Sequence, residues 1–266
     1  MNYKAKSTLE KLEKNMRFKN YSERTIEVYV NYAEKFLKSF DNDIYHISQK
    51  QAKQWLIDYN YSSISQQNQI ISAVKALYKY VVNSKLVVVN IERPRKEKKL
   101  PVIIDKDFLL DKISKIENLK HKAIISLGAS VGLRVSEVVN LKITDIDSDR
   151  MVINIRNAKG KKDRIVPLSE NILNLLREYF KNYKPKEYLF NGQSKLMYTA
   201  SSCNKLVKKY IRNDYHYHLL RHFTFTNLVD QGIDISYVQK LAGHNDIKTT
   251  SIYVHLSNVK SLPLAL

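Results

Sequence analysis

The sequence is poor in the residues from which several common protein classes are built. Its 266 residues include one cysteine, Cys203, and only six glycines and five prolines. A single cysteine excludes an internal disulfide framework and favours a reducing compartment. No glycine-rich phosphate loop and no Cys/His cluster with zinc spacing is present. We therefore expect the chain to work without a metal ion, a nucleotide or another cofactor.

Long apolar runs are also missing. No stretch approaches the roughly 20 residues that a membrane-spanning helix needs. The first residues, "MNYKAKSTLEKLEKNMRF", lack the apolar core of a signal peptide. We expect no membrane association and a cytoplasmic, nucleoid-associated location.

Acidic residues are scarce relative to basic ones. Lys plus Arg number 45 against 26 for Asp plus Glu, which gives a formal net charge of +19. Such an excess repels itself in a compact fold, so the composition favours a polyanionic partner. Nucleic acid is the first candidate, and an anionic membrane surface is a weaker second.

Residues 1–90 show helical periodicity and predict a small helical bundle. Two segments start at residues suited to capping a helix, Ser22 and Ser48. A third segment, residues 63–82, carries apolar residues on one stripe and lysines on another. These are Ile70, Val74, Leu77 and Val81 on the first stripe, and Lys75 and Lys79 on the second.

The composition then changes over residues 91–103. The stretch "RPRKEKKLP" has five basic residues, two prolines and no periodicity. It predicts an extended basic linker between a domain of residues 1–90 and one of residues 104–266. A solvated surface loop is the alternative. The candidate DNA-binding residues of the linker are Arg95, Lys96, Lys98 and Lys99.

The second domain is predicted to be mostly helical with a small antiparallel sheet. Residues 104–146 predict helices, one ending near Gly132 and the next capped by Ser136. Residues 151–168 predict a β-hairpin, whose second strand ends at Pro167 or lies at a sheet edge. Five helices should follow, the last over "IKTTSIYVHL". The fold class is thus mainly α, with a helical bundle followed by this domain.

Two places near the hairpin could bind or protonate an anion. Arg134 precedes a helix start, where the helix dipole disfavours a cation unless an anion completes the arrangement. An ion pair with Glu137 explains Arg134 equally well. At the hairpin tip, a lysine beside glycine could protonate a leaving oxygen, although tip lysines are usually solvated. The tip offers Lys159, Lys161 and Lys162.

Two further places lie near the end of the chain. His218 and Arg221 share one helix face, where a guanidinium fork matches two phosphate oxygens and an imidazole can exchange a proton. The sequence leaves His222 open between a structural role and a role in a site. His244 follows Gly243 at a predicted helix end, and Tyr253 comes nine residues later. A tyrosine in such a chain ordinarily packs against a core.

The order of these motifs resembles the tyrosine recombinase family, which includes phage integrases and Xer-type recombinases. The sequence has G-L-R-x-S-E, K-G-x-K-D-R after a strand, H-x-x-R-H, G-H, and then a tyrosine. "SERTIEVYVNYAEKFL" and "SQQNQIISAVKALYKY" are similar to helices of that family's core-binding domain. The likeness covers nearly the whole chain.

The resemblance implies a role for each matching residue. Arg134 and Arg221 would clamp the scissile phosphate, and His218 and His244 would hydrogen-bond it. Lys159 would be the general acid, and Tyr253 the nucleophile. Glu137 would support Arg134. Lower-ranked DNA contacts are Lys75, Lys79, Lys161, Lys162 and the linker residues.

The resemblance also implies an activity and partners. The chain would be a two-domain, site-specific DNA recombinase that forms a 3′-phosphotyrosyl intermediate. It would act as a homotetramer on two double-stranded DNA sites, with the short C-terminal tail docked on its own domain or on a neighbour. An accessory protein or partner recombinase remains open, as does the choice between chromosome- or plasmid-dimer resolution and integration or excision. A non-catalytic DNA-binding protein, a type IB topoisomerase and a hairpin telomere resolvase are the alternatives.

Overall fold

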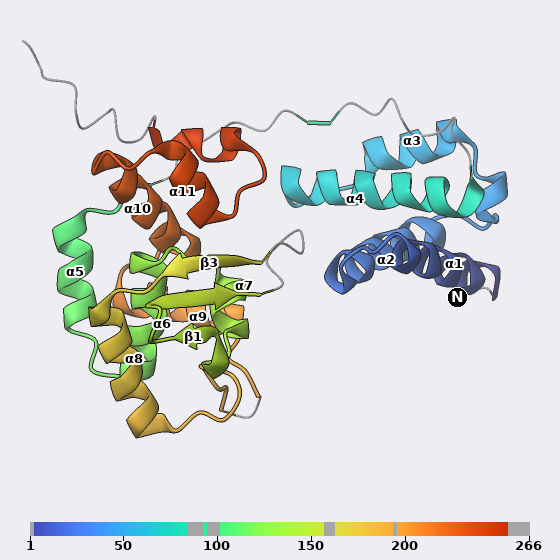
Figure 1. Ribbon diagram of the computed structural model, residues 1–266. Helices are drawn as coiled ribbons and strands as arrows, with labels where there is room; N and C mark the ends of the chain where they lie inside the picture. The colour runs from blue at the N-terminus through green and yellow to red at the C-terminus, as the bar shows by residue number, and fades with distance from the viewer. Residues whose placement is uncertain (1–2, 84–92, 95–101, 157–162, 194–195, 255–266) are drawn as a thin grey trace, which may run out of the picture. The chain divides into compact units, whose positions relative to one another are not determined.

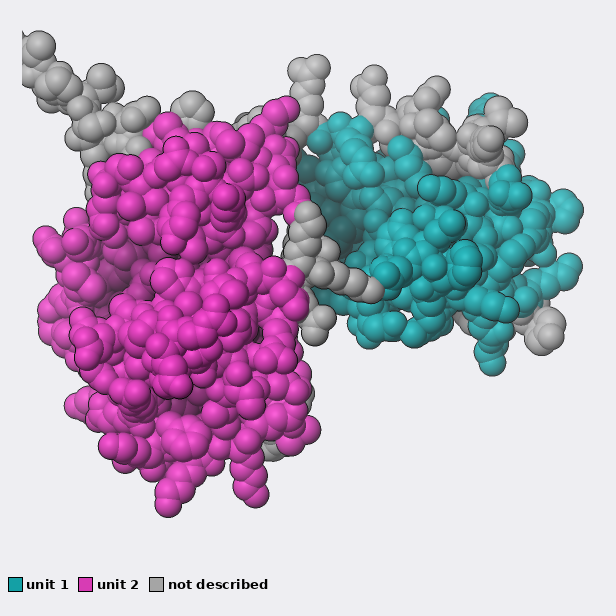
Figure 2. Space-filling view, in the orientation of Figure 1, with its two compact units in different colours: residues 1–99 teal, residues 100–266 magenta. Residues whose placement is uncertain are grey.

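The chain forms two compact units, residues 1–99 and 100–266, which Figure 2 colours separately. The structure, a computed structural model, describes residues 3–83, 93–94, 102–156, 163–193 and 196–254. Each unit has a hydrophobic core of its own. Within these described ranges, no helix has both the length and the apolarity to cross a bilayer.

Unit 1 is a bundle of helices, as its periodicity predicts (Figure 1). Ser22 and Ser48 are the N-caps of their helices, so both predicted caps are confirmed. The predicted apolar stripe of residues 70–81 is buried, and α4 packs against α2. A π-helical turn, Tyr78–Val82, continues α4. The four helices are α1 (Tyr3–Phe18), α2 (Glu23–Lys38), α3 (Gln49–Asp58) and α4 (Ile64–Leu77).

Arg93, the first described residue of the predicted linker, is bound to polar side chains of α4. Arg93 donates to the Asn68 amide oxygen at 2.9 Å and to the Ser72 hydroxyl at 3.0 Å. Burial, and then the charge of Arg93, lowers the pKa of Lys75. Lys79 is exposed and lies over the Tyr80 ring. The other candidate DNA contacts of the linker, Arg95, Lys96, Lys98 and Lys99, lie outside the described residues.

Unit 2 is built around one central helix, α6 (Leu119–Ser130). Every residue from Ala123 to Ala129 is buried, because the other helices of the unit surround α6. The helices that contact it are α5 (Lys106–Ser114), α7 (Val135–Asn140), α8 (Glu170–Tyr183), α9 (Ala200–Tyr210) and α10 (Tyr217–Asp230). The remaining helix, α11 (Ile235–Ala242), packs against α10 and β3 (Figure 1).

The predicted hairpin is confirmed within a three-stranded antiparallel sheet. Its strands are β2 (Val152–Ile155) and β3 (Arg164–Pro167), with Ile153 opposite Val166. Pro167 both ends β3 and lies on an edge strand, since the order is β1-β2-β3. The expectation of helix through residue 146 was wrong, because a 3₁₀ turn at Ile143–Asp145 leads into β1 (Ile146–Asp147). A two-residue strand is too short to show alternation in sequence.

Two predictions about where helices begin and end need correction. Ser136 is not an N-cap, because α7 begins one residue earlier and Arg134 is its N-cap. The Glu137 carboxylate accepts the Arg134 backbone N–H at 2.8 Å, as the third helical residue does in a capping box. The helix predicted over residues 247–256 is also interrupted within its described part, residues 247–254. A 3₁₀ turn at Ile247–Thr249 precedes a short helical stretch at residues 251–254.

A third, small apolar cluster joins α10, α11 and the segment that follows them. It consists of Phe225, Val238, Ala242 and Tyr253, all 1% exposed or less. Gly132, between α6 and α7, has φ +68°, and a Cβ there would lie 2.8 Å from the Phe225 ring. The turn therefore needs glycine both for its backbone conformation and for this close approach.

We predict that Gly132→Ala destabilises the protein more than Gly232→Ala does. Both glycines have positive φ, which costs an alanine about 1–2 kcal/mol. Only Gly132 is also crowded by a ring, because nothing lies within 4 Å of a Cβ at Gly232. Calorimetric melting of both variants measures the difference. Equal decreases in Tm would mean that Phe225 moves aside without cost.

Candidate active site

Three arginines converge on the C-terminal end of α11. The last carbonyls of a helix lack donors within the helix and carry a partial negative charge, so guanidinium groups suit them. Gly243, with φ +59°, ends α11 as predicted. Three successive carbonyl oxygens each accept one arginine: Leu241 from Arg164 Nε at 2.8 Å, Ala242 from Arg221, and Gly243 from Arg134 at 2.9 Å.

A single carboxylate, Glu137, sits among these guanidiniums. One oxygen accepts from Arg134 at 2.8 Å and from Arg164 at 2.7 Å. The other accepts from Arg164 at 2.8 Å and from the Arg134 backbone. Burial opposes ionisation of this side chain, but the hydrogen bonds and charge of Arg164, followed by those of Arg134, lower its pKa to about 2. Glu137 is therefore an anion throughout the physiological range.

Arg221 is fully buried and has no carboxylate of its own. It donates to the Gly132 carbonyl at 2.6 Å and to that of Ala242, and it lies over the Phe225 ring. Its Nε is buried and has no partner among the described residues. Burial and then the charge of Arg134 lower its pKa to about 9. Three guanidiniums against one carboxylate leave an excess of positive charge that a bound anion would balance.

His244 lies in the turn after α11, within reach of Arg221. Its Nε2 is 3.2 Å from a terminal Arg221 nitrogen, and its Nδ1 is 3.0 Å from the Thr250 hydroxyl. A guanidinium can only donate, so Nε2 is the acceptor and Nδ1 carries the proton. Burial, and then the charges of Arg221 and Arg134, lower the His244 pKa to about 4. In the free protein this imidazole is neutral and faces Arg221 with a lone pair.

His218 and His222 lie one turn apart on α10, with ring centroids 4.5 Å apart. Loss of water around each ring, and then nearby charges, lower both pKa values to about 4. His218 is exposed whereas His222 is half-buried, so we expect the smaller shift at His218. The Nδ1 of His222 is buried without a partner among the described residues, and its ring lies 5.7 Å from that of Tyr253. His222 thus lies beside Tyr253 in the candidate site and is not a residue of the hydrophobic core of unit 2.

Tyr253 makes ring contacts with several residues of the candidate site. It is 1% exposed, and its ring lies 6.4 Å from that of His244 and 5.6 Å from that of Phe225. Burial raises the pKa of its phenol, while the charges of Arg221 and Arg134 act in the opposite direction. By contrast Tyr237, on α11, is half exposed.

The structure brings most of the sequence-predicted residues together. Arg134, Glu137, Arg221 and His244 are linked by hydrogen bonds or shared partners, and Tyr253 and His218 join them through ring contacts. The hairpin lysines, Lys159, Lys161 and Lys162, lie outside the described residues. Sequence reasoning missed Arg164, although it lies within the K-G-x-K-D-R motif, because an arginine beginning an edge strand is usually solvated. It also missed Thr250, which has no distinguishing sequence feature.

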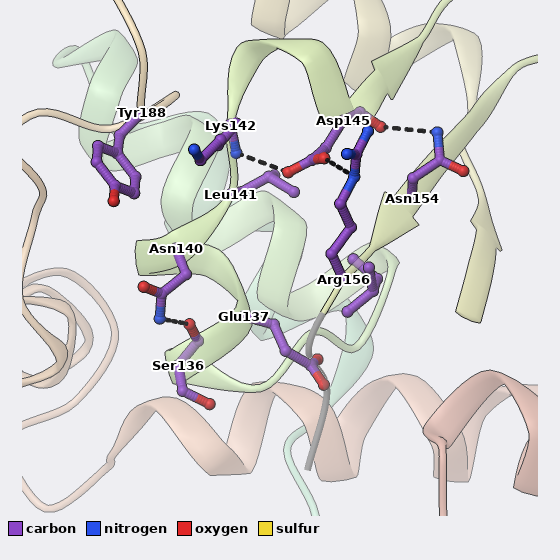
Figure 3. A pocket seen from close by; sticks show the side chains of 10 residues that line it. Ser136, Glu137, Asn140, Leu141, Lys142, Asp145, Asn154, Arg156 and Tyr188 are labelled. Atoms are coloured by element: carbon purple, nitrogen blue, oxygen red, sulfur yellow. Dashed lines mark hydrogen bonds and ion pairs between the residues drawn. The ribbon is translucent and has the colours of Figure 1, made fainter. Parts of the chain in front are cut away.

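A polar pocket next to α7 is lined by Glu137 and Asn140 and by residues that follow this helix (Figure 3). Asp145 accepts from the Lys142 backbone at 2.9 Å and pairs with Arg156 at 2.8 Å. Figure 3 shows the Glu137 carboxylate pointing away from this pair. Across the part of the chain that the structure describes, no group of three or more metal-ligating side chains is close enough to hold an ion.

Comparison with known proteins identifies the family of the chain. The sequence profile of the phage integrase family matches residues 106–259, and that of the phage integrase N-terminal SAM-like domain matches residues 8–87. A tyrosine recombinase of Thermosipho africanus is 30% identical, over 90% of this chain and 91% of its own. Tyrosine recombinase XerA of Pyrococcus horikoshii is 31% identical, over 94% and 89%.

A solved structure extends the likeness to three dimensions. The XerH site-specific recombinase, in a pre-cleavage complex with its difH substrate, superposes with a TM-score of 0.70 at 26% identity, covering 89% of this chain and 79% of XerH. The chain belongs to the phage integrase family of tyrosine recombinases, which are enzymes of site-specific DNA recombination.

We predict that His222 and His244 stay neutral down to about pH 5, and that His244 carries its proton on Nδ1. The folded pKa of each, about 4, lies below the usual 6.5, so the unfolded chain binds more protons between these values. Their contribution to stability is therefore complete above about pH 6.5 and lost as pH falls towards 4. Nitrogen-15 NMR of the imidazoles, assigned with His→Gln variants, measures both properties. An Nε2-protonated His244 at pH 6 would contradict the Arg221 contact.

Proposed function

We propose that this recombinase cleaves and rejoins double-stranded DNA through a covalent bond between Tyr253 and a 3′-phosphate. The observation that carries the proposal is the place of Tyr253, enclosed by His222, His244 and Phe225 beside an arginine cluster with excess positive charge. A phosphodiester supplies the missing anion, and a phenol is a nucleophile suited to its phosphorus.

Arg134 and Arg221 would bind the two non-bridging oxygens of the scissile phosphate. Both are held by backbone carbonyls at the α11 end, so little reorganisation is needed as charge develops during the reaction. The unpartnered Nε of Arg221 offers one donor directly. His244 would exchange its Arg221 contact for the phosphate, with a proton taken up at Nε2 so that this nitrogen can donate, and His218 would approach from the exposed side of α10.

The proposed cleavage step needs neither a metal ion nor a nucleotide, because protein groups account for each bond and each proton. The Tyr253 oxygen forms a bond to phosphorus as its phenolic proton passes to a neighbouring base. The bond from phosphorus to the 5′-oxygen breaks, and Lys159 protonates that oxygen. Reversal with a 5′-hydroxyl from another strand rejoins the DNA, because the phosphotyrosyl bond conserves the energy of the phosphodiester.

The remaining parts of the chain would hold and pair the DNA. Residues 1–90 would bind one side of the duplex, with Lys75, Lys79 and the basic linker of residues 91–103 contacting phosphates. Residues 104–266 would carry the catalytic groups. Four copies would join two sites, and the C-terminal tail could link neighbours. The relatives include Xer recombinases and putative integrases, so the exchange would serve dimer resolution or element integration and excision.

We predict that Tyr253→Phe binds DNA but forms no covalent adduct. Phenylalanine keeps the ring contacts with His222, Phe225 and His244 but lacks the attacking oxygen. Wild-type protein trapped on genomic DNA fragments should appear as a DNA-linked band on a denaturing gel. Tyr237→Phe, which alters an exposed tyrosine of α11, is the matched control and should form the adduct normally. An adduct from Tyr253→Phe, and none from Tyr237→Phe, would assign the nucleophile to Tyr237.

We predict that Lys159→Ala fails to cleave ordinary DNA but cleaves DNA whose 5′-bridging oxygen is replaced by sulfur. A thiolate leaves without protonation, so the substrate no longer needs a general acid. Lys161→Ala, in the same loop, should cleave both substrates. If Lys161→Ala, and not Lys159→Ala, cleaved only the sulfur-substituted DNA, the general acid would be Lys161.

A further inference from the structure

Arg164 uses its whole guanidinium group on protein oxygens. Its Nε donates to the Leu241 carbonyl at 2.8 Å, and its two terminal nitrogens donate to the Glu137 carboxylate at 2.7 and 2.8 Å. The side chain is 10% exposed. Arg221 differs, because its Nε has no partner among the described residues. Arg164 is therefore arranged to hold protein groups rather than to bind a substrate.

The group that Arg164 holds is the one that orients Arg134. A planar guanidinium that grips both oxygens of a carboxylate fixes its orientation as well as its position. Glu137 thus presents one oxygen to the Arg134 side chain and the other to the Arg134 backbone, each at 2.8 Å. Without Arg164, the carboxylate would be free to rotate and would hold the Arg134 guanidinium less rigidly.

Arg164 also lies flat against the turn that follows α11. A Cβ at Gly243 would come within 3.2 Å of Arg164 Cδ and within 3.3 Å of its Nε. The absence of that Cβ lets the arginine cross the turn and reach Leu241. One side chain therefore joins the start of β3, the start of α7 and the end of α11.

We propose that Arg164 is a positioning residue for strand cleavage, which holds Glu137 by both oxygens and through it fixes Arg134 against the scissile phosphate. The inference rests on the proposed function, because it assigns Arg134 to the phosphate. Arg164 itself does not touch the DNA phosphate. Its loss disturbs the clamp and leaves the tyrosine and the leaving-group acid in place.

The test compares Arg164→Met with Arg156→Met. The two arginines lie at the base of the same hairpin, where Ile155 pairs with Arg164. Arg156 also pairs with a buried carboxylate, Asp145, at 2.8 Å, and Figure 3 shows the Glu137 carboxylate pointing away from this pair. On a DNA fragment that wild-type protein captures covalently, Arg164→Met should form the adduct about 10²-fold more slowly, as for a misplaced catalytic group. Arg156→Met should stay near the wild-type rate, and both should bind the fragment.

Three further measurements separate positioning from general loss of structure. Arg164→Lys keeps the charge but not the fork, so its rate should lie between those of wild type and Arg164→Met. Sulfur at the 5′-bridging position should not rescue Arg164→Met, since the leaving-group acid is intact. At acid pH, Arg164→Met should lose more of its rate than wild type does, because Glu137 stays buried without the partner that most lowers its pKa. Adding Glu137→Gln should remove that extra loss.

The outcomes distinguish this inference from the proposed function. Wild-type protein without a Tyr253-dependent adduct would overturn the proposed function itself. A normal adduct from wild type and an equal rate from Arg164→Met would overturn only the role of Arg164. Rescue by sulfur would also overturn it, because Arg164 would then act through the hairpin. Should Arg164→Met unfold, the rates of Arg164→Lys and Arg156→Met decide, and equal rates contradict the inference.

Discussion

The contact between the C-terminal end of α11 and three guanidiniums organises the second unit of this recombinase. Like charges repel, and fully burying even one arginine is costly unless its donors are satisfied. Three successive carbonyl oxygens and the Glu137 carboxylate accept hydrogen bonds from Arg134, Arg164 and Arg221, although the Nε of Arg221 has no partner among the described residues. The same contact brings β3, α7 and α10 to one helix end. The interactions that hold the proposed catalytic arginines therefore also hold these elements of the fold together.

The arrangement also explains how Arg221 tolerates complete burial before DNA arrives. Ala242 and Gly132 supply carbonyl oxygens, and the neutral imidazole of His244 supplies a nitrogen lone pair. Backbone carbonyls cannot rotate away, so they keep the guanidinium oriented. The imidazole can turn, and Thr250 holds its other nitrogen. His244 is thus the replaceable partner, and the carbonyls are the permanent ones.

Periodicity predicted the helices and the hairpin because amphipathic stretches and β-branched runs must bury one face. The stripe from Ile70 to Val81 and the pair of Ile153 with Val166 illustrate this. The motif order, through its family resemblance, predicted the candidate site residues. It could not predict Arg164, because the partners of Arg164 are the Leu241 carbonyl, 77 residues away, and the Glu137 carboxylate, 27 residues away. The Ser136 cap failed because α7 begins at Val135, with Arg134 as its N-cap and Glu137 bound to the Arg134 backbone N–H. The spacing of neighbouring residues does not reveal partners that are far away in the sequence.

With Tyr253 as the proposed nucleophile, the enclosure of this residue has a consequence for DNA outside the recombination sites. The residue is 1% exposed and shares an apolar cluster with Phe225, Val238 and Ala242. A phosphodiester cannot reach it unless side chains move, and withdrawing a ring from such a cluster costs roughly 1.5–3 kcal/mol. That cost alone keeps the attacking arrangement to about a tenth or less of the free molecules. A single copy on random DNA would therefore rarely present Tyr253 to a phosphate, and cleavage would require contacts that offset the cost of exposing it.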